Sequence, residues 1–215
     1  MTAVVPKLKN MATIVAIEGI HGCGKSTFIE ALRKRGRTVI DEGFMQTEMS
    51  EFSPSGIARQ TVWVANWIER AVKAVKRNGL ETNMVYVDRS MWSAVIYNEG
   101  GGNQAKALQH TIVEAEKELE ECGYNIVKVL LLDNHKAAWL NIIDRLKKEP
   151  HRKSFKEHDE SHYENVWNKY YVNEKNRWDV SMNMPQAYVS EEVAIAELDL
   201  AVAKMIAPNA ERRVP

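Results

Sequence analysis

Cysteine is scarce in this sequence, with Cys23 and Cys122 the only two among 215 residues. Two cysteines cannot form a disulfide framework or a four-cysteine metal site, so they indicate a reducing compartment, which we take to be the cytoplasm. No apolar run reaches the length of about 18 residues that marks a membrane-spanning helix, so no membrane is expected as a partner. Residues 1–12 have no apolar core before a cleavage site, and we expect a loose leader rather than a secretory signal.

An excess of charge is also missing. The 29 Lys and Arg residues balance the 29 Asp and Glu residues, so the formal net charge is zero. This balance gives no reason to expect a nucleic-acid polymer as a partner, whereas a small anion needs only a few local cations. The six histidines show no spacing typical of a zinc site. The hydrophobic fraction of 45% and the chain length fit one globular domain with a sizeable core.

Short apolar runs alternate with helical patterns along the chain. Strands are expected at residues 13–17, 38–40, 84–87, 126–132 and within 178–184, and helices at 25–35, 57–77, 104–121, 137–148, 160–174 and 191–206. Such alternation is typical of an α/β fold with a five-stranded parallel sheet and helices on both faces. We expect a single domain over residues 13–208, followed by a tail at residues 209–215.

Charged side chains fall where three of these strands end. The strand ends carry Glu18-Gly19, Asp41-Glu42 and Asp88-Arg89. Because ligands of parallel α/β sheets bind at the carboxyl ends of the strands, these residues predict where the functional site lies.

The first of these strand ends continues into a glycine-rich loop. Residues 19–26 fit the pattern G-x-x-x-x-G-K-[ST], in which glycines leave backbone N–H groups free to bind phosphate, at the positive N-terminus of a helix. The pattern predicts a P-loop NTPase fold with ATP and Mg²⁺ as cofactors. Lys25 would reach the β- and γ-phosphates, and Ser26 and Asp88 would hold Mg²⁺. The predicted ATP-binding residues are Gly19, Ile20, His21, Gly22, Cys23, Gly24, Lys25, Ser26 and Thr27.

Two motifs of GTPases are absent from the sequence. It contains no Asn-Lys-x-Asp segment to read guanine and no Asp-x-x-Gly switch. Larger motor-type ATPases need a longer chain than this one. The remaining P-loop enzymes are the small kinases that act on nucleotides, nucleosides or other small molecules.

Two stretches resemble the thymidylate kinase and deoxynucleoside kinase superfamily. Residues 17–27 are similar to its E-G-x-x-G-x-G-K-[ST]-T opening. Residues 88–93, with Tyr97 and Asn98, resemble the D-R-[YF]-x-x-S-x-x-x-Y-Q stretch of thymidylate kinases, and the glycines at 100–102 follow at the family's place. The resemblance implies ATP-dependent phosphorylation of a small nucleotide or nucleoside acceptor. It also implies a homodimer, because members of this superfamily often form dimers.

Other positions leave the branch of the superfamily open. Thymidylate kinases usually carry an acid where His21 stands and an arginine near residues 41–44, and neither is present. Phe28 and Gln60 resemble deoxynucleoside kinases instead. The favoured function is phosphorylation of a thymidylate-like deoxynucleoside monophosphate. The alternatives are a deoxynucleoside kinase and, as a third reading, a nucleotide-binding protein without turnover.

The resemblance and the strand ends together assign roles to individual side chains. Arg89 would grip the acceptor or the transferred group, and Asp41 or Glu42 would accept a proton or position the acceptor. A basic stretch resembles a lid near residues 145–160, where Arg145 and Arg152 would close over ATP. The predicted acceptor-binding residues are Phe44, Gln60, Arg89, Trp92 and Tyr97.

Overall fold

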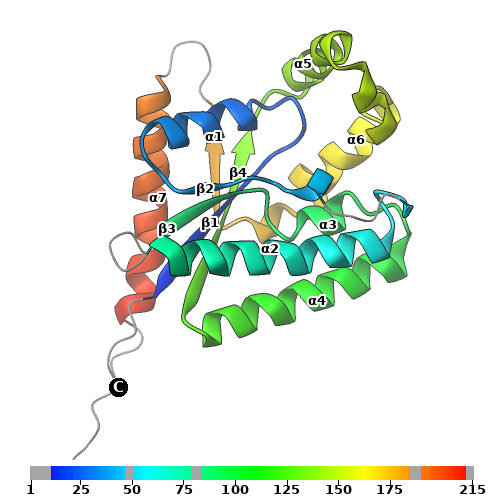
Figure 1. Ribbon diagram of the computed structural model, residues 1–215. Helices are drawn as coiled ribbons and strands as arrows, with labels where there is room; N and C mark the ends of the chain where they lie inside the picture. Colours follow the sequence, from blue (N-terminus) through cyan, green and yellow to red (C-terminus); the bar gives the residue numbers. More distant parts are fainter. Residues whose placement is uncertain (1–10, 47–50, 79–83, 185–189, 212–215) are drawn as a thin grey trace, which may run out of the picture.

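The computed structural model describes residues 11–46, 51–78, 84–184 and 190–211 (Figure 1). Five strands form one parallel sheet in the order β2-β3-β1-β4-β5, which confirms the predicted α/β fold. The strands are β1 (Ala12–Glu18), β2 (Val39–Ile40), β3 (Met84–Asp88), β4 (Tyr124–Leu132) and β5 (Val180–Asn183).

The α-helices are α1 (Lys25–Lys34), α2 (Ile57–Asn78), α3 (Ser93–Ile96), α4 (Gly102–Glu121), α5 (His135–Lys148), α6 (Glu160–Asn168) and α7 (Glu191–Glu211). The sequence predicted six of the helices described here, and α3 was not predicted. The helix expected at residues 160–174 changes after Asn168 into a π-helix, Lys169–Asn173. Helix α7 continues through residue 209, where we expected the tail to begin, and most of the expected leader lies outside the described residues.

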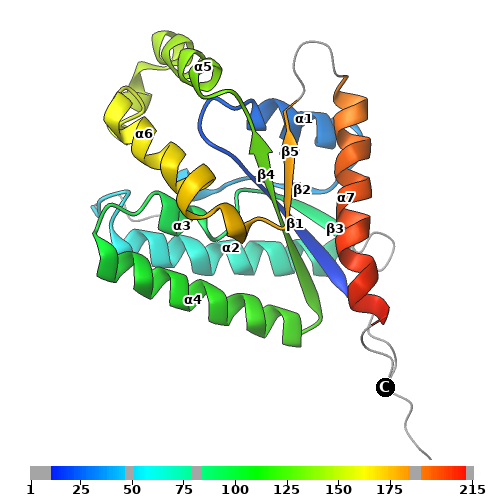
Figure 2. The ribbon, with the colours of Figure 1, turned by 180° about the vertical axis from the view of Figure 1, so that it is seen from behind.

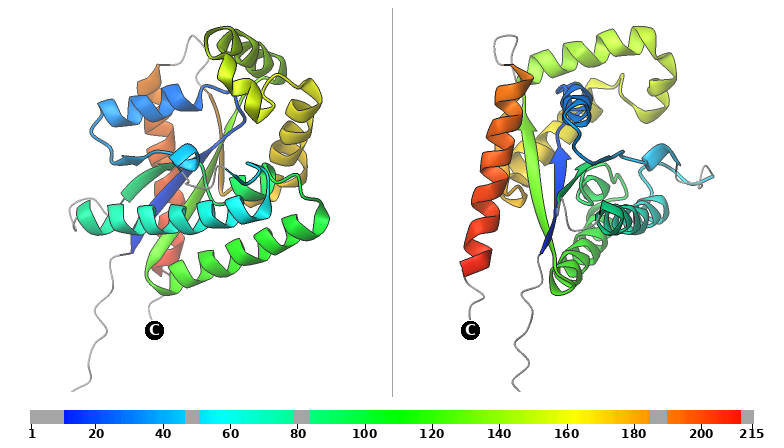
Figure 3. Two further views of the ribbon diagram at one scale, coloured as in Figure 1. Left: turned by 45° about the vertical axis from the view of Figure 1, so that its right-hand side comes forward. Right: turned by 60° about the vertical axis from the view of Figure 1, so that its left-hand side comes forward.

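Layers of helices cover the two faces of the sheet (Figures 2 and 3). Helix α7 packs on one face against β4 and β5, while α2 and α4 lie on the opposite face against β3, β1 and β4. The central strand β1 is buried along its whole length, as expected for a strand covered on both sides. None of the described helices combines the length and apolarity needed to cross a bilayer.

The sheet topology brings three strand ends together. Strands β2, β3 and β1 are neighbours and parallel, so the segments that follow Ile40, Asp88 and Glu18 leave the sheet at the same edge. Helices α5 and α6 stand at this edge of the molecule (Figure 1). The candidate site therefore lies between the sheet and these two helices.

Candidate active site

The phosphate loop between β1 and α1 requires glycine at two positions. Gly22 and Gly24 have φ angles of 84° and 83°, in the left-handed region that favours glycine. A Cβ atom on Gly22 would lie only 2.2 Å from the Ala138 carbonyl oxygen. Asn141 Nδ2 donates to the Gly22 carbonyl oxygen at 2.9 Å, so helix α5 holds the loop in this conformation.

Lys25 opens α1 as its first residue and is buried. Its ammonium group donates to the Asp88 carboxylate at the end of β3. Ser26 and Thr27 are exposed in the first turn of the same helix. A hydroxyl and a carboxylate are oxygen ligands that suit Mg²⁺, so Ser26 and Asp88 fit the metal site predicted for them. Cys23 is buried in the loop, and burial raises the pKa of its thiol. The thiol therefore stays protonated, and Cys23 fills space in the loop rather than acting as a nucleophile.

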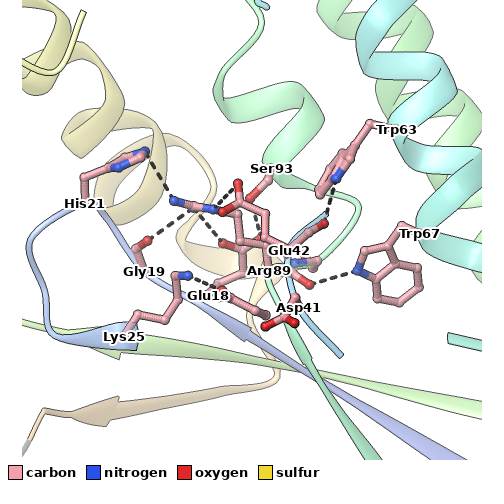
Figure 4. A network of polar contacts seen from close by, with 12 residues as sticks. Glu18, Gly19, His21, Lys25, Asp41, Glu42, Trp63, Trp67, Arg89 and Ser93 are labelled. Atoms are coloured by element: carbon pink, nitrogen blue, oxygen red, sulfur yellow. Dashed lines mark hydrogen bonds and ion pairs between the residues drawn. The ribbon is translucent and has the colours of Figure 1, made fainter. Parts of the chain in front are cut away.

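Arg89 lies at the centre of the site, as Figure 4 shows. Its φ angle of 71° is left-handed, and 3% of the residue is exposed. The guanidinium group forms an ion pair with Glu42 at 2.9 Å and donates to the Tyr170 hydroxyl at 2.9 Å. It also lies over the Tyr97 ring, 4.9 Å from the ring centroid. These contacts help to orient the guanidinium group of Arg89 at the end of β3.

A fully buried carboxylate, that of Glu18, lies next to the Arg89 guanidinium. Glu18, at the end of β1, accepts hydrogen bonds from the Ser90 backbone, the Ser90 and Ser93 hydroxyls and the Tyr170 hydroxyl, all between 2.7 and 2.8 Å. Its second oxygen lies 3.7 Å from Arg89 Nη1. A buried charge is tolerated when it is paired and hydrogen-bonded, and both carboxylate oxygens of Glu18 accept hydrogen bonds.

Helix α2 holds the backbone of both Glu42 and Arg89. Trp63 Nε1 and Arg70 Nη2 donate to the Glu42 carbonyl oxygen at 3.1 and 2.6 Å, and Trp67 Nε1 donates to the Arg89 carbonyl oxygen at 2.9 Å. We call these three side chains, Trp63, Trp67 and Arg70, the α2 clamp. It fixes the segment after β2 relative to the end of β3.

The two acids after β2 point in different directions. Asp41 is 70% exposed and pairs with Arg33 on α1, so its carboxylate faces away from Arg89. Glu42 faces Arg89 instead. Burial disfavours ionisation of Glu42, but the charges of Arg89 and Lys25 outweigh it and lower the pKa of the carboxyl. Of the two predicted acids, Glu42 is therefore the ionised carboxylate of the site, and the prediction for Asp41 is withdrawn.

A cavity of about 380 Å³ opens in front of Glu42. Three of the predicted acceptor-binding residues line it, namely Phe44, Gln60 and Tyr97. Gln60 Nε2 donates to the Pro54 carbonyl oxygen at 2.7 Å, which orients its amide. The rest of the wall includes Ile20, His21, Trp63, Glu99, Phe155, Lys156, Tyr163 and Val166. An aromatic and apolar wall with a few polar groups is typical of a small-molecule site.

Trp92 does not line this cavity, so we withdraw it as an acceptor contact. It is 2% exposed, and its indole N–H donates to Glu116 of α4 at 2.9 Å. The Arg177 guanidinium covers its ring at 4.2 Å from the centroid. The chain turns at Ser90 after the strand end, which sends Trp92 into the packing between α4 and the sheet rather than toward Glu42.

The predicted lid arginines converge on one carboxylate. Arg145 and Arg152 contact Glu157 at 2.7 and 3.2 Å, and His21 Nδ1 lies 3.0 Å from the same side chain. Burial opposes the charge of Glu157, but these partners outweigh it and lower its pKa to about 2. Burial likewise lowers the pKa of His21 to about 4. The segment at residues 150–157 thus contacts the phosphate loop directly.

Several residues of the site were not found from the sequence. Glu18, Glu157, Tyr170 and the α2 clamp act through partners far away in the chain, such as Tyr170 and Glu18, which are 152 positions apart. A buried glutamate at a strand end was visible in the sequence, but nothing local identified its partners. The rings of Trp63 and Trp67 are buried in the core, and nothing in the sequence pointed to the hydrogen bonds that their N–H groups donate.

Comparisons with known proteins agree with this geometry. A model of the AAA domain family matches residues 14–179, and the chain belongs to this family. A gluconokinase from Sinorhizobium meliloti 1021 is similar in structure, with a TM-score of 0.54 and 15% identity over 95% of this chain and 99% of that one. A deoxyadenosine kinase from M. mycoides with bound dCTP has a TM-score of 0.50 and 14% identity, over 86% and 98%. These likenesses confirm the P-loop NTPase fold. No curated protein matches the sequence.

Proposed function

We propose that this member of the AAA domain family transfers the γ-phosphoryl group of ATP to a hydroxyl group of a small acceptor, and that the acceptor is a deoxynucleoside. The position of Glu42 carries the proposal. Its carboxylate lies on the cavity wall, 2.9 Å from Arg89 and on the side of the phosphate loop. A hydroxyl acceptor must lose a proton during transfer, and Glu42 is the ionised carboxylate placed to take it.

The reaction follows from the contacts at the site. The hydroxyl proton of the acceptor passes to Glu42, the acceptor oxygen bonds to the γ-phosphorus, and the bond to the β,γ-bridging oxygen breaks as ADP leaves. Lys25 and the loop N–H groups hold the phosphates, and Arg89 stabilises charge on the transferred group. Held by Ser26 and Asp88, Mg²⁺ would neutralise phosphate charge. Arg145 and Arg152, which both contact Glu157, are assigned to a lid that would exclude water from the site.

The charges of the cavity favour a neutral acceptor. Its described lining has three carboxylates, Glu42, Glu99 and Glu157, against two cations, Arg152 and Lys156. Both cations are already paired, with Glu157 at 3.2 Å and with Glu99 at 2.7 Å. A monophosphate brought next to Glu42 would meet like charge, and no unpaired lysine or arginine of the described lining is there to hold it.

Phosphorylation of a deoxynucleoside monophosphate stays the second candidate. The stretch from Asp88 to Tyr97, which resembles thymidylate kinases, favours it, and Tyr97 does line the cavity. That reaction needs no general base, because a monophosphate is already ionised at neutral pH. Glu42 would then position Arg89 rather than take a proton.

The names of the two structural neighbours support a hydroxyl acceptor. Gluconokinase and deoxyadenosine kinase act on molecules that carry hydroxyl groups and no phosphate.

A homodimer, expected from the family resemblance, stays a prediction.

The test is a comparison of Glu42→Gln with the wild type on a panel of deoxynucleosides, their monophosphates and gluconate, with MgATP. Loss of transfer to a deoxynucleoside in Glu42→Gln, with ATP binding retained, supports the proposal. Transfer to a monophosphate that survives the substitution would establish the second candidate. ATP binding without transfer to any acceptor would indicate a nucleotide-binding protein without turnover.

A further inference from the structure

His21 bridges the lid segment and the catalytic arginine. It lies in the phosphate loop, with Nδ1 3.0 Å from Glu157 and Nε2 3.2 Å from Arg89 Nη2. The ring also meets the edge of Tyr97, with centroids 5.2 Å apart and planes at 89°. The side chain of His21 is 25% exposed, and that of Glu157 is 4% exposed. The bridge is therefore largely shielded from water.

These two contacts define the protonation of the ring. A guanidinium group only donates hydrogen bonds, so Nε2 must accept and cannot carry a proton. A carboxylate only accepts, so Nδ1 must carry the proton toward Glu157. The imidazole is then neutral and in the Nδ1–H form. Burial and the charge of Arg89 both lower the pKa of His21, in agreement with a neutral ring.

The contact with His21 gives the Arg89 guanidinium a hydrogen-bond acceptor at Nη2. Nη1 donates to Tyr170, Nε faces Glu42, and Nη2 donates to His21. The backbone of Arg89 has a left-handed φ angle that residues other than glycine rarely adopt. Without the acceptor at Nε2, the outer edge of the guanidinium would be free to turn away from Glu42.

We propose that His21 is a positioning residue whose Nδ1–H tautomer, fixed by Glu157, accepts a hydrogen bond from Arg89 and so holds the guanidinium against Glu42. The inference rests on the proposed phosphoryl transfer. Glu157 belongs to the segment that follows α5, so the position of this segment and the orientation of Arg89 are linked through one imidazole ring.

Three substitutions separate the two contacts of the ring. In His21→Gln the amide oxygen reaches about as far as Nε2 and can still accept from Arg89. In His21→Asn the amide reaches only as far as Nδ1, so it keeps the contact with Glu157 and loses Arg89. His21→Leu loses both. We expect kcat of His21→Gln to exceed that of the other two by about tenfold, the value of a hydrogen bond to a charged group. The KM for the acceptor should change far less than kcat.

The tautomer can be measured without turnover. In ¹⁵N spectra of histidine-labelled protein at neutral pH, the resonances of His21, assigned by their absence in His21→Gln, should show a protonated Nδ1 and a bare Nε2. A ring protonated at Nε2, or at both nitrogens, overturns the inference. So does His21→Asn with the kcat of the wild type. If the expected tautomer is found but no acceptor is phosphorylated by the wild type, the proposed function fails and the bridge to Arg89 stands.

Discussion

At the scale of single residues, Glu42 is the side chain on which the proposed reaction depends. We predict that Glu42→Gln lowers kcat with a hydroxyl acceptor by about 10²- to 10⁴-fold, the range of a lost general base. Binding of ATP should be unchanged, because Glu42 is not part of the phosphate loop. Steady-state rates and calorimetric titration with ATP measure the two effects.

Asp41 provides the matched control for this substitution. It is the neighbouring acid, but it is 70% exposed and pairs with Arg33. We therefore expect Asp41→Asn to keep the kcat of the wild type. Equal losses in the two variants would contradict the assignment of the base to Glu42.

The pH dependence of transfer gives a second prediction for Glu42. The base works only when it is ionised, and Arg89 and Lys25 lower the pKa of its carboxyl below the ordinary value of 4.5 despite its burial. The acid limb of kcat/KM should therefore lie below pH 4.5, provided that the protein stays folded there. An acid limb near pH 6 to 7 would contradict an ionised Glu42 and point to a histidine.

At the scale of elements, the phosphate loop is held against α5. We predict that Gly22→Ala weakens ATP binding by about tenfold or more and destabilises the fold by about 1–3 kcal/mol, because its Cβ would overlap the Ala138 carbonyl and its φ angle is left-handed. Gly36→Ala is the control, since Gly36 has a φ angle of 73° with open space around its Cβ. It should cost about 1 kcal/mol and leave ATP binding unchanged. Urea unfolding and titration with ATP test both variants. Similar ATP affinities of Gly22→Ala and Gly36→Ala would contradict the close packing of Gly22 against the Ala138 carbonyl.

A separate prediction concerns helix α2 and the clamp residue Trp67. Trp67→Phe removes the N–H that bonds the buried Arg89 carbonyl at 2.9 Å, and an unsatisfied buried carbonyl costs about 1–3 kcal/mol. We expect lower stability together with lower kcat, because Arg89 loses its backbone anchor. Trp139→Phe on α5, where the ring is only partly buried, is the control. An unchanged kcat in Trp67→Phe would separate the clamp from catalysis.

The same elements show what the sequence could and could not predict. The phosphate loop and the strand ends were predicted because their signals are local, with glycines, a lysine and acids at fixed spacing. Glu157 and the α2 clamp were missed, and Glu18 was predicted only as part of a strand end, because their partners come from other elements. Trp92 was misplaced although it lies only three residues after Arg89, since the turn at Ser90 directs it toward α4. Spacing predicts where the backbone runs, whereas packing decides which way a side chain points.

At the scale of the whole molecule, the burial of His21 and the charged partners of Glu157 make folding stability depend on pH. The pKa of His21 falls from 6.5 to about 4, and that of Glu157 from 4.5 to about 2, so the unfolded chain binds protons more strongly at both sites. Stability should therefore be full above pH 6.5, fall toward pH 4 as the unfolded chain takes up the proton of His21, and fall further toward pH 2 with Glu157. Urea unfolding across this range tests the effect. In His21→Gln the curve should be flatter between pH 6.5 and 4, and an identical curve would contradict a lowered pKa of His21 in the folded protein.

The choice of acceptor decides whether Glu42 acts as a general base. The measurement is the initial rate of phosphoryl transfer from MgATP to each deoxynucleoside and to the matching 5′-monophosphate, with Lys25→Ala to show that transfer depends on the phosphate loop. We predict faster transfer to a deoxynucleoside hydroxyl, with Lys25→Ala inactive. Faster transfer to the monophosphate would contradict the role of Glu42 as the base.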